Sequence, residues 1–116
     1  MSERNTELID RFYRCMAMGD ERGLAELYAP DAAMIRFDGT SEGVSEIIAF
    51  LSTVRERHQK YELEAIDQVT QAEDVLMWDA MVRTTDGLLQ TTEVLVLDKA
   101  GKIVRHIPGM RGYWGL

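Results

Sequence analysis

The spacing of apolar residues changes once along this chain, and that change limits its fold more than any other feature. Up to residue 58, apolar side chains recur every three or four positions in the stretches 6–18, 20–28 and 44–58, which predicts three helices. Beyond residue 58 they alternate with polar ones in four segments, 61–69, 75–84, 88–97 and 103–114, which predicts strands. A further short strand is predicted at residues 32–38.

This order of elements predicts an α+β fold in a single domain that spans residues 1–116. Turn sequences at Asp86-Gly87 and at residues 98–101 join the later strands as hairpins. We therefore expect a cone-shaped, strongly curved, mixed but mostly antiparallel sheet wrapped on three N-terminal helices, in the order α-α-β-α-β-β-β-β. Such a cone commonly holds a small-molecule cavity, because bulges and breaks open one end.

The closing stretch, residues 101–116, contains a break of this kind. Pro108 has no amide hydrogen to give to a ladder, so it belongs at a bulge or at a sheet edge. We expect Pro108-Gly109 to bend the last strand. Beyond this bend, the side that turns toward the cavity would carry Met110, Gly112 and Trp114. The outward side would carry Arg111 and Tyr113.

The charge balance argues against several classes of partner. Thirteen basic residues against twenty acidic ones give a net charge of −7. Phosphate backbones and anionic membrane surfaces repel such a domain, so neither nucleic acid nor a membrane is expected as a partner. Cys15 is the single cysteine, which fits a reducing compartment. Because the charged N-terminus does not resemble a signal peptide, we expect a cytoplasmic protein.

Two acidic residues stand alone in apolar strand segments. Glu93 shares a strand face with Thr91 and Leu95, and Asp79 lies in the preceding strand segment. Folding about the intervening turn pairs positions whose numbers sum to roughly 173, which would make Asp79 and Glu93 adjacent or diagonal neighbours. When two carboxyl groups lie close together, their pKa values move apart, so that one can act as an acid and the other as a base. The alternative is that both face solvent or pair with arginines.

Arg36 and Asp38 share one face of the first predicted strand. Arg36 could hold Glu93 ionised or bind a ligand oxygen, or it could form a structural ion pair. His106 in the last strand is a candidate proton shuttle, whereas His58 ends a helix, where a cation suits the dipole. No group of residues has the spacing of metal ligands, so we expect neither a metal nor a cofactor.

Three local motifs carry a resemblance to a known family. They are FYRCMAMGD followed by LAELYAPDAAM (residues 12–20 and 24–34), GTSEGVSEIIAFL (residues 39–51) and the closing MRGYWG (residues 110–115). With the element order, these motifs resemble the nuclear transport factor 2-like superfamily, in its SnoaL-like and ketosteroid-isomerase-like branch. The resemblance implies the curved fold and a homodimer. It does not fix a reaction, because that superfamily hosts isomerases, epoxide hydrolases, cyclases, dehydratases and binding modules.

The resemblance carries over to single residues only in part. Phe12 stands where ketosteroid isomerases have an oxyanion-donating tyrosine, and Arg36 stands where they have the proton-shuttling aspartate, with Asp38 two residues on. Glu93 matches the second oxyanion donor, an acid kept neutral by its pocket. In related epoxide hydrolases and cyclases the second acid lies near Glu62 or Glu64. Classical steroid isomerisation is therefore not expected.

The sequence thus predicts a cavity protein that performs cofactor-independent acid–base catalysis on a hydrophobic small molecule, of the isomerase, epoxide hydrolase or cyclase type. The alternative is a non-catalytic ligand-binding or dimerisation module. The catalytic candidates are Asp38, Asp79, Glu93, Arg36 and His106. The candidates for substrate binding are Phe12, Met16, Met34, Met77, Met81, Met110 and Trp114. Trp78 or Tyr113 is the expected contact in a homodimer.

Overall fold

The structure is a computed structural model and describes residues 2–115. In chain order these form α1 (Glu3–Met18), α2 (Glu21–Ala25), β1 (Tyr28–Arg36), β2 (Gly39–Glu42), α3 (Val44–His58), β3 (Glu62–Ala72), β4 (Val75–Thr84), β5 (Gly87–Leu97) and β6 (Ile103–Gly115). The α+β class and the succession of four late strands are confirmed.

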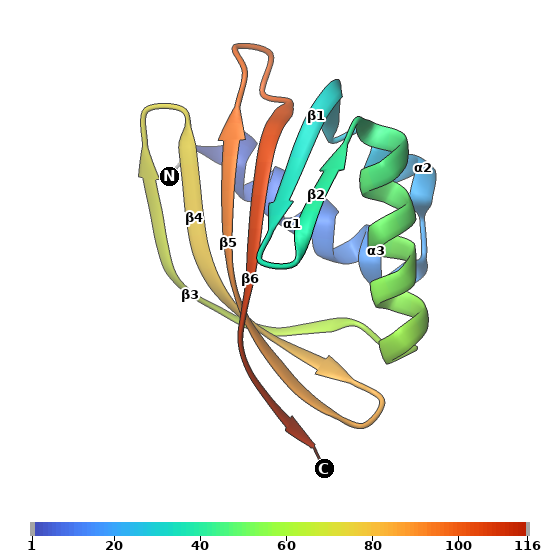
Figure 1. Cartoon of the computed structure of the whole chain (residues 1–116). Helices are drawn as coiled ribbons and strands as arrows, with labels where there is room; N and C mark the ends of the chain where they lie inside the picture. Colours follow the sequence, from blue (N-terminus) through green and yellow to red (C-terminus); the bar gives the residue numbers. More distant parts are fainter. Residues whose placement is uncertain (1, 116) are drawn as a thin grey trace.

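The strands form one sheet in the order β2-β1-β6-β5-β4-β3. β1 runs parallel to β6, and the other neighbouring pairs are antiparallel. The strands curl around the helices, with α1 crossing behind the sheet and α3 beside β1 and β2 (Figure 1). The sheet is therefore mixed, mostly antiparallel and strongly curved, as the sequence predicts.

The ends of α1 follow from local chemistry. The Ser2 hydroxyl accepts a hydrogen bond of 3.2 Å from the amide of Asn5, so Ser2 is the N-cap, and the helix begins before residue 6, where the sequence placed its start. Gly19 ends the helix with a φ of 70°, a left-handed conformation that glycine adopts at little cost. Asp20 then caps α2 by accepting a bond of 2.9 Å from the amide of Gly23.

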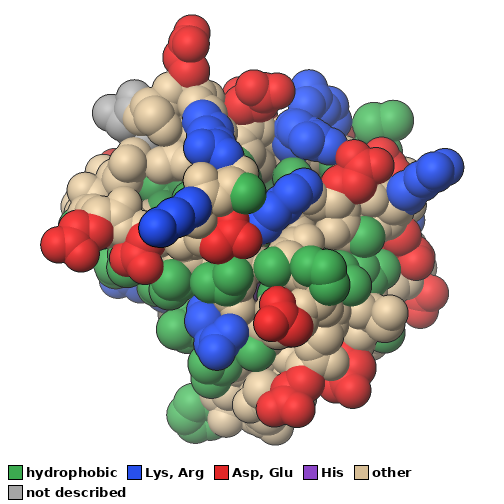
Figure 2. Space-filling view, turned by 90° about the horizontal axis from the view of Figure 1, so that it is seen from above, with side chains coloured by type: hydrophobic (Ala, Val, Ile, Leu, Met, Phe, Trp, Pro, Cys, Tyr) green, Lys and Arg blue, Asp and Glu red, His purple; other side chains and the backbone are tan. Residues whose placement is uncertain are grey.

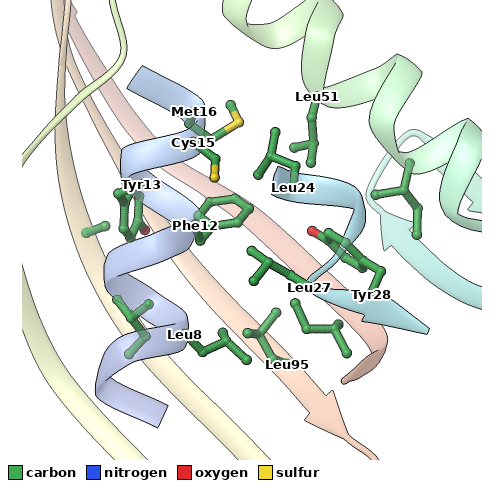
Figure 3. Close-up of a cluster of buried hydrophobic side chains, with 14 of the residues drawn as sticks. Leu8, Phe12, Tyr13, Cys15, Met16, Leu24, Leu27, Tyr28, Leu51 and Leu95 are labelled. Atoms are coloured by element: carbon green, nitrogen blue, oxygen red, sulfur yellow. The ribbon is translucent and has the colours of Figure 1, made fainter. Parts of the chain in front are cut away.

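One face of α1 packs into the concave side of the sheet. Its apolar residues recur at helical spacing, and they meet the inward side chains of β4 and β5 (Figure 3). On β4 the inward positions alternate strictly with partly exposed ones. The inward set of β4 is Leu76, Trp78, Ala80, Val82 and Thr84. This alternation decides which side of the sheet each candidate residue faces.

Three local features differ from the prediction. Residues 39–42 form a strand, β2, which the sequence analysis did not include, because they pair with the end of β1 from Arg36↔Gly39 to Ala33↔Glu42. The second helix stops at Ala25, so Tyr28 opens β1 instead of closing that helix. The turn between β4 and β5 is formed by residues 85–86, with Gly87 already paired with Thr84.

Candidate active site

A chain of three hydrogen-bonded side chains lies inside the cone. The hydroxyl oxygen of Tyr28 is 2.8 Å from Nδ1 of His106, and Nε2 of His106 is 2.6 Å from Oε1 of Glu93. The relative exposures of Tyr28, His106 and Glu93 are 4%, 1% and 3%. A phenol, an imidazole and a carboxylate are thus linked away from solvent, and together they can hold or move a proton.

Strand register brings this chain together. Glu93 pairs with Trp78 on β4, an inward residue, so the Glu93 side chain also points into the cone. On the other side of β5, Leu95 pairs with His106, which makes Glu93 and His106 diagonal neighbours on the same face. Tyr28 reaches the imidazole from β1, which runs parallel to β6.

Aromatic rings surround the chain. The ring of Phe12 meets His106 edge-on at 5.8 Å between centroids, and the Tyr28 ring stacks against the imidazole at 6.0 Å. In Figure 3, Phe12 on α1 and Tyr28 at the start of β1 point toward each other across the interior. The rings exclude water from His106 and fix the plane of its imidazole.

A second polar contact lies beside the first. The indole Nε1–H of Trp78 donates a hydrogen bond of 2.8 Å to the hydroxyl oxygen of Tyr13, and the ring of Tyr61 stacks on Tyr13 at 6.5 Å. Thr91, two residues before Glu93 on the same face of β5, is buried, and its Oγ1 makes no hydrogen bond to the described residues. Hydrogen-bonding capacity is therefore left over next to Glu93.

The buried tyrosines remain protonated. Burial raises the pKa of Tyr28 well above its usual range, and the charge of Glu93 raises it further. The same two causes, in the same order, raise the pKa of Tyr13, to which Tyr61 adds a smaller increase. Burial and then Glu93 likewise raise the pKa of Tyr61. Near neutral pH all three phenols are therefore uncharged hydrogen-bond donors.

One arrangement of protons satisfies all three groups of the chain. In it, the O–H of Tyr28 donates to Nδ1 of His106, and the N–H at Nε2 donates to Oε1 of the Glu93 carboxylate. Among the described residues, no hydrogen bond reaches the second carboxylate oxygen, Oε2. The arrangement thus holds one oxygen of Glu93 and leaves the other for a ligand.

The expected pairing of Asp79 with Glu93 is wrong. Asp79 pairs with Thr92 and lies on the outer face of the sheet, because β4 turns Trp78 inward and its neighbour outward. There it accepts hydrogen bonds of 2.7 Å from the Thr92 hydroxyl and 2.9 Å from Arg111. The sheet itself separates the two carboxylates, and Asp79 has the arginine partner that the alternative reading anticipated.

Arg36 and Asp38 form the structural ion pair that was the second reading of their spacing. The guanidinium donates to Asp38 at 3.1 Å and to the Ser41 hydroxyl at 2.6 Å, and it lies 4.0 Å above the ring of Phe50. The Asp38 side chain is 76% exposed in the turn between β1 and β2. Arg36 therefore does not balance the charge of Glu93, as the first reading supposed.

The predicted binding residues divide between the two sides of the sheet. Phe12, Met16 and Met34 are buried in the core. Met77, Met110 and Trp114 are 38%, 71% and 51% exposed, and the partly buried Met81 lies on the outward positions of β4. Met110 pairs with the inward Thr91 and therefore shares the inner face, at an exposed end of it. Met77, Met81 and Trp114 do not line the interior, and the prediction for those three is wrong.

The last strand follows the prediction only in part: Met110 faces inward and Arg111 outward as expected, whereas Trp114 and Tyr113 lie on the opposite faces to those expected. β1 pairs with β6 only as far as His106, so the rest of β6 has β5 as its one recorded neighbour in the described sheet. The register shift in this part lies opposite Gln90 and Thr91, so the bulge falls at Arg111 and not at Pro108-Gly109. Trp78, expected at a dimer contact, is in fact buried.

Sequence reasoning missed Tyr13, Tyr28, Trp78, Tyr61 and Thr91 as members of the site. A signal existed for Tyr13, because Ile9, Tyr13 and Met16 fall at i, i+4 and i+7 on one helix face. Tyr28 gave none, since assigning it to the second helix hid its place at the start of β1.

Two surface hollows lie away from this site. One of about 200 Å³ lies between α1 and the turn before β6, and one of about 120 Å³ lies between α1, α2 and α3. Seen from above, Lys and Arg side chains are interspersed with Asp and Glu around a band of hydrophobic side chains (Figure 2). Within residues 2–115 no group of side chains could hold a metal ion, and no helix is long and apolar enough to cross a membrane.

Comparison with known proteins agrees with this architecture. The family model described as SnoaL-like domain matches residues 9–106. The chain belongs to the SnoaL-like domain family. The match ends on His106, so it includes all three members of the buried chain. A search of curated protein sequences finds no match.

Solved structures share the SnoaL-like fold at low sequence identity. A candidate polyketide cyclase from Sinorhizobium meliloti is 20% identical, with a TM-score of 0.74 over 88% of this chain and 93% of that one. An NTF2-like protein of unknown function from Burkholderia pseudomallei is 22% identical, with a TM-score of 0.76 over 95% and 92%. A de novo designed protein with a curved β-sheet reaches 0.79 at 15% identity, over 95% and 88%.

Proposed function

We propose that this SnoaL-like chain catalyses proton transfer on a hydrophobic small molecule without a cofactor, and that Glu93 takes and returns the proton. The observation that carries the proposal is the 2.6 Å hydrogen bond between His106 and Glu93 in the dry interior of the cone. Carboxylates and imidazoles are the side chains that most often act as general bases and acids.

In this proposal each group has a task. Oε2 of Glu93 accepts a proton from a carbon next to the substrate carbonyl, the C–H electrons move into the carbonyl, and an enolate forms. His106 keeps its bond to Oε1 throughout, so that the carboxyl group stays in place. Returning the proton to another carbon gives an isomer, whereas attack of the enolate carbon on an electrophile gives a ring.

Isomerase or cyclase chemistry fits these groups better than epoxide opening by an acidic pair. The second carboxylate that such a pair would need is absent from the described buried residues, and Asp79 is bound to Thr92 and Arg111 on the outer face. The name of the cyclase-like structural neighbour from Sinorhizobium meliloti supports the same choice.

The test is exchange of acidic C–H protons in D₂O. 2-Tetralone, an apolar ketone with acidic α-protons, is incubated with the protein, and deuterium incorporation is followed by NMR. We expect Glu93→Gln to lower the exchange rate by about 10²–10⁴-fold, the range for a lost general base. The matched control is Asp79→Asn, which changes a carboxylate on the neighbouring strand that faces the opposite way. No exchange above background in a panel of apolar ketones, or an unchanged rate in Glu93→Gln, would overturn the proposal.

A non-catalytic binding module is the second candidate, and one observation favours it. Tyr28, His106 and Glu93 are almost completely enclosed by side chains, and both recorded hollows lie away from them. If the chain only binds, Glu93→Gln will change the affinity for ketones and neither the wild type nor the variant will exchange protons.

A further inference from the structure

The hydroxyl of Thr91 is out of keeping with its surroundings. Thr91 is 6% exposed on the inner face of β5, and its Oγ1 has no hydrogen-bond partner among the described residues. A buried polar group without a partner is costly, and valine would fill the same space without that cost. Such a group calls for an explanation, and an incoming ligand is one.

Thr84 is a buried threonine whose hydroxyl group does form hydrogen bonds, and it serves as a comparison for Thr91. It is as buried as Thr91 and also faces inward, on the neighbouring strand β4. Its Oγ1 lies 3.0 Å from the carbonyl oxygen of Gly87 and 3.2 Å from Oδ1 of Asp86. The fold therefore pairs one buried threonine fully and leaves the other free, next to Glu93.

Tyr13 supplies a second hydroxyl at the same place. Because the indole of Trp78 donates to the Tyr13 oxygen, the phenol proton must point elsewhere. Burial raises the pKa of Tyr13 most, and side-chain hydrogen bonding to Trp78 and then to Thr91 lowers it, so the hydroxyl groups of Thr91 and Tyr13 are neighbours, although their contact lacks the geometry of a formed hydrogen bond. Trp78 thereby acts as a positioning residue for the Tyr13 proton.

The charge of the interior limits what these donors can bind. Among the described residues no lysine or arginine is buried. Arg36 is held by Asp38, Arg55 by the end of α1, and Arg111 by Asp79. A ligand carboxylate would meet the charge of Glu93 with no cation to balance it, whereas an uncharged oxygen would meet two hydroxyl donors.

We propose that Thr91 and Tyr13 form a subsite for an uncharged ligand oxygen, a ketone carbonyl or a hydroxyl group, and that the site discriminates against carboxylates. This inference rests on the proposed function, because it names the substrate class of the same site. It places the substrate oxygen at the two hydroxyls and the reacting carbon at Oε2 of Glu93. The Thr91 and Tyr13 protons then stabilise the negative charge that grows on the oxygen.

Binding is tested with two probes of similar shape. 2-Naphthol is uncharged at pH 7 and 2-naphthoate is an anion. Titrations are followed on the indole N–H resonance of Trp78, whose hydrogen bond to Tyr13 makes it a local reporter. We expect naphthol to shift this resonance and to bind at least tenfold more tightly than naphthoate. Equal binding of the two probes, or tighter binding of naphthoate, would overturn the inference.

Thr91→Val and Thr84→Val form the matched pair of variants. We expect Thr91→Val to weaken naphthol binding by about tenfold, as for a lost hydrogen bond, and to leave the melting temperature unchanged or higher. Thr84→Val should lower the melting temperature and leave binding unchanged. Thr91→Ser, which keeps the hydroxyl, should retain most of the affinity. If Thr91→Val destabilises the protein as Thr84→Val does, its hydroxyl is satisfied in the free protein, for example by a structural water, and the subsite is excluded.

The two proposals fail separately. Unchanged naphthol binding in Thr91→Val removes the subsite but leaves the effect of Glu93→Gln on proton exchange intact. Unchanged exchange in Glu93→Gln removes the catalytic proposal, whereas the contrast between Thr91→Val and Thr84→Val in binding and melting temperature would still stand.

Discussion

At the scale of single residues, His106 is the most constrained side chain of the site. Tyr28 binds one ring nitrogen, Glu93 the other, and Phe12 packs edge-on against the ring. Contacts at both ring nitrogens fix the plane of the imidazole. Proton exchange at this ring would therefore have to pass through Glu93 or Tyr28.

The buried phenols give a test of the interior at high pH. Burial and the charge of Glu93 raise the pKa values of Tyr13, Tyr28 and Tyr61, and a hydrogen bond to Asp86 raises that of Tyr113 on the surface. Because the folded values lie above the unfolded value of about 10, their contribution to stability is complete below pH 10 and is lost as the pH rises further. We expect the phenolate absorbance of the three buried tyrosines at 295 nm to appear only together with loss of near-ultraviolet circular dichroism, whereas the surface phenol of Tyr113 ionises in the folded protein.

The Tyr113→Phe variant is the control for this titration. It removes the surface phenol and leaves the three buried ones, so the delayed, cooperative rise in absorbance should persist. A step near pH 10 with the amplitude of three tyrosines in a protein that is still folded would show that the interior is open to water.

The sequence identified part of the site at this scale. Alternation in the fifth strand correctly suggested that Glu93 could face inward beside Thr91, and the last strand offered His106. Their mutual contact could not be foreseen, because it depends on the diagonal between Glu93 and His106 that the β5–β6 register creates. A register shift by one residue would turn either side chain to the other face.

At the scale of elements, the C-terminal end of α1 is bound by an arginine of α3, a contact that the sequence did not predict. Arg55 of α3 donates from Nε to the carbonyl oxygen of Met16 at 2.9 Å and from an Nη atom to that of Ala17 at 3.3 Å. These carbonyls have no partner within the helix, and a cation suits the negative end of the helix dipole. The contact therefore ties α3 to the helix that carries Tyr13.

Replacing Arg55 should loosen this junction. We expect Arg55→Met to lower the free energy of unfolding by about 1–2 kcal/mol, as for a hydrogen bond to a charged donor that is partly exposed. Urea unfolding measures the change. Arg57→Met is the matched control, because Arg57 is exposed two residues later on α3 and has no recorded ion pair or hydrogen bond. Equal losses in the two variants would show that helix propensity, not the contact with α1, explains the effect.

Most elements were predictable because their apolar periods are clear, and the exceptions have physical causes. β2 is four residues long and mostly polar, so only its pairing with β1 makes it a strand. The turn at residues 85–86 lies one position earlier than the Asp-Gly signal suggested, since Gly87 already pairs with Thr84. Pro108 lies on β6 beyond His106, the last residue of β6 that pairs with β1. The amide hydrogen that Pro108 lacks is therefore not needed by any carbonyl group of β1.

At the scale of the whole molecule, the curved sheet is a fold that very different sequences adopt. The designed protein with a curved β-sheet superimposes on this chain with a TM-score of 0.79 at 15% identity. Fold and reaction are therefore separate questions here: the period change predicts the cone, whereas the chemistry depends on the few polar side chains that the cone encloses.

The outer face of the sheet carries a stripe of partly exposed apolar side chains. Ile35 and Ile107 directly follow the paired residues Met34 and His106, so they lie side by side on the side of the sheet away from the helices. Val94 pairs with both Ile107 and Met77, which continues an apolar stripe across β6, β5 and β4. Ile35, Ile107 and Met77 are 41%, 40% and 38% exposed.

We propose that a second copy of the chain covers this stripe. The stripe is apolar on each strand that it crosses, and the ion pair between Arg111 and Asp79 neutralises charge on the same face. Two copies that each carry a charge of −7 repel one another, so screening by salt should strengthen the dimer.

Sedimentation velocity at micromolar concentration should give twice the 13.2 kDa of one chain, with a dissociation constant that falls as salt is raised. Ile107→Asp should give monomers, whereas Met18→Asp, which alters an equally apolar and more exposed residue at the end of α1, should not. A monomeric wild type at every salt concentration would contradict this arrangement.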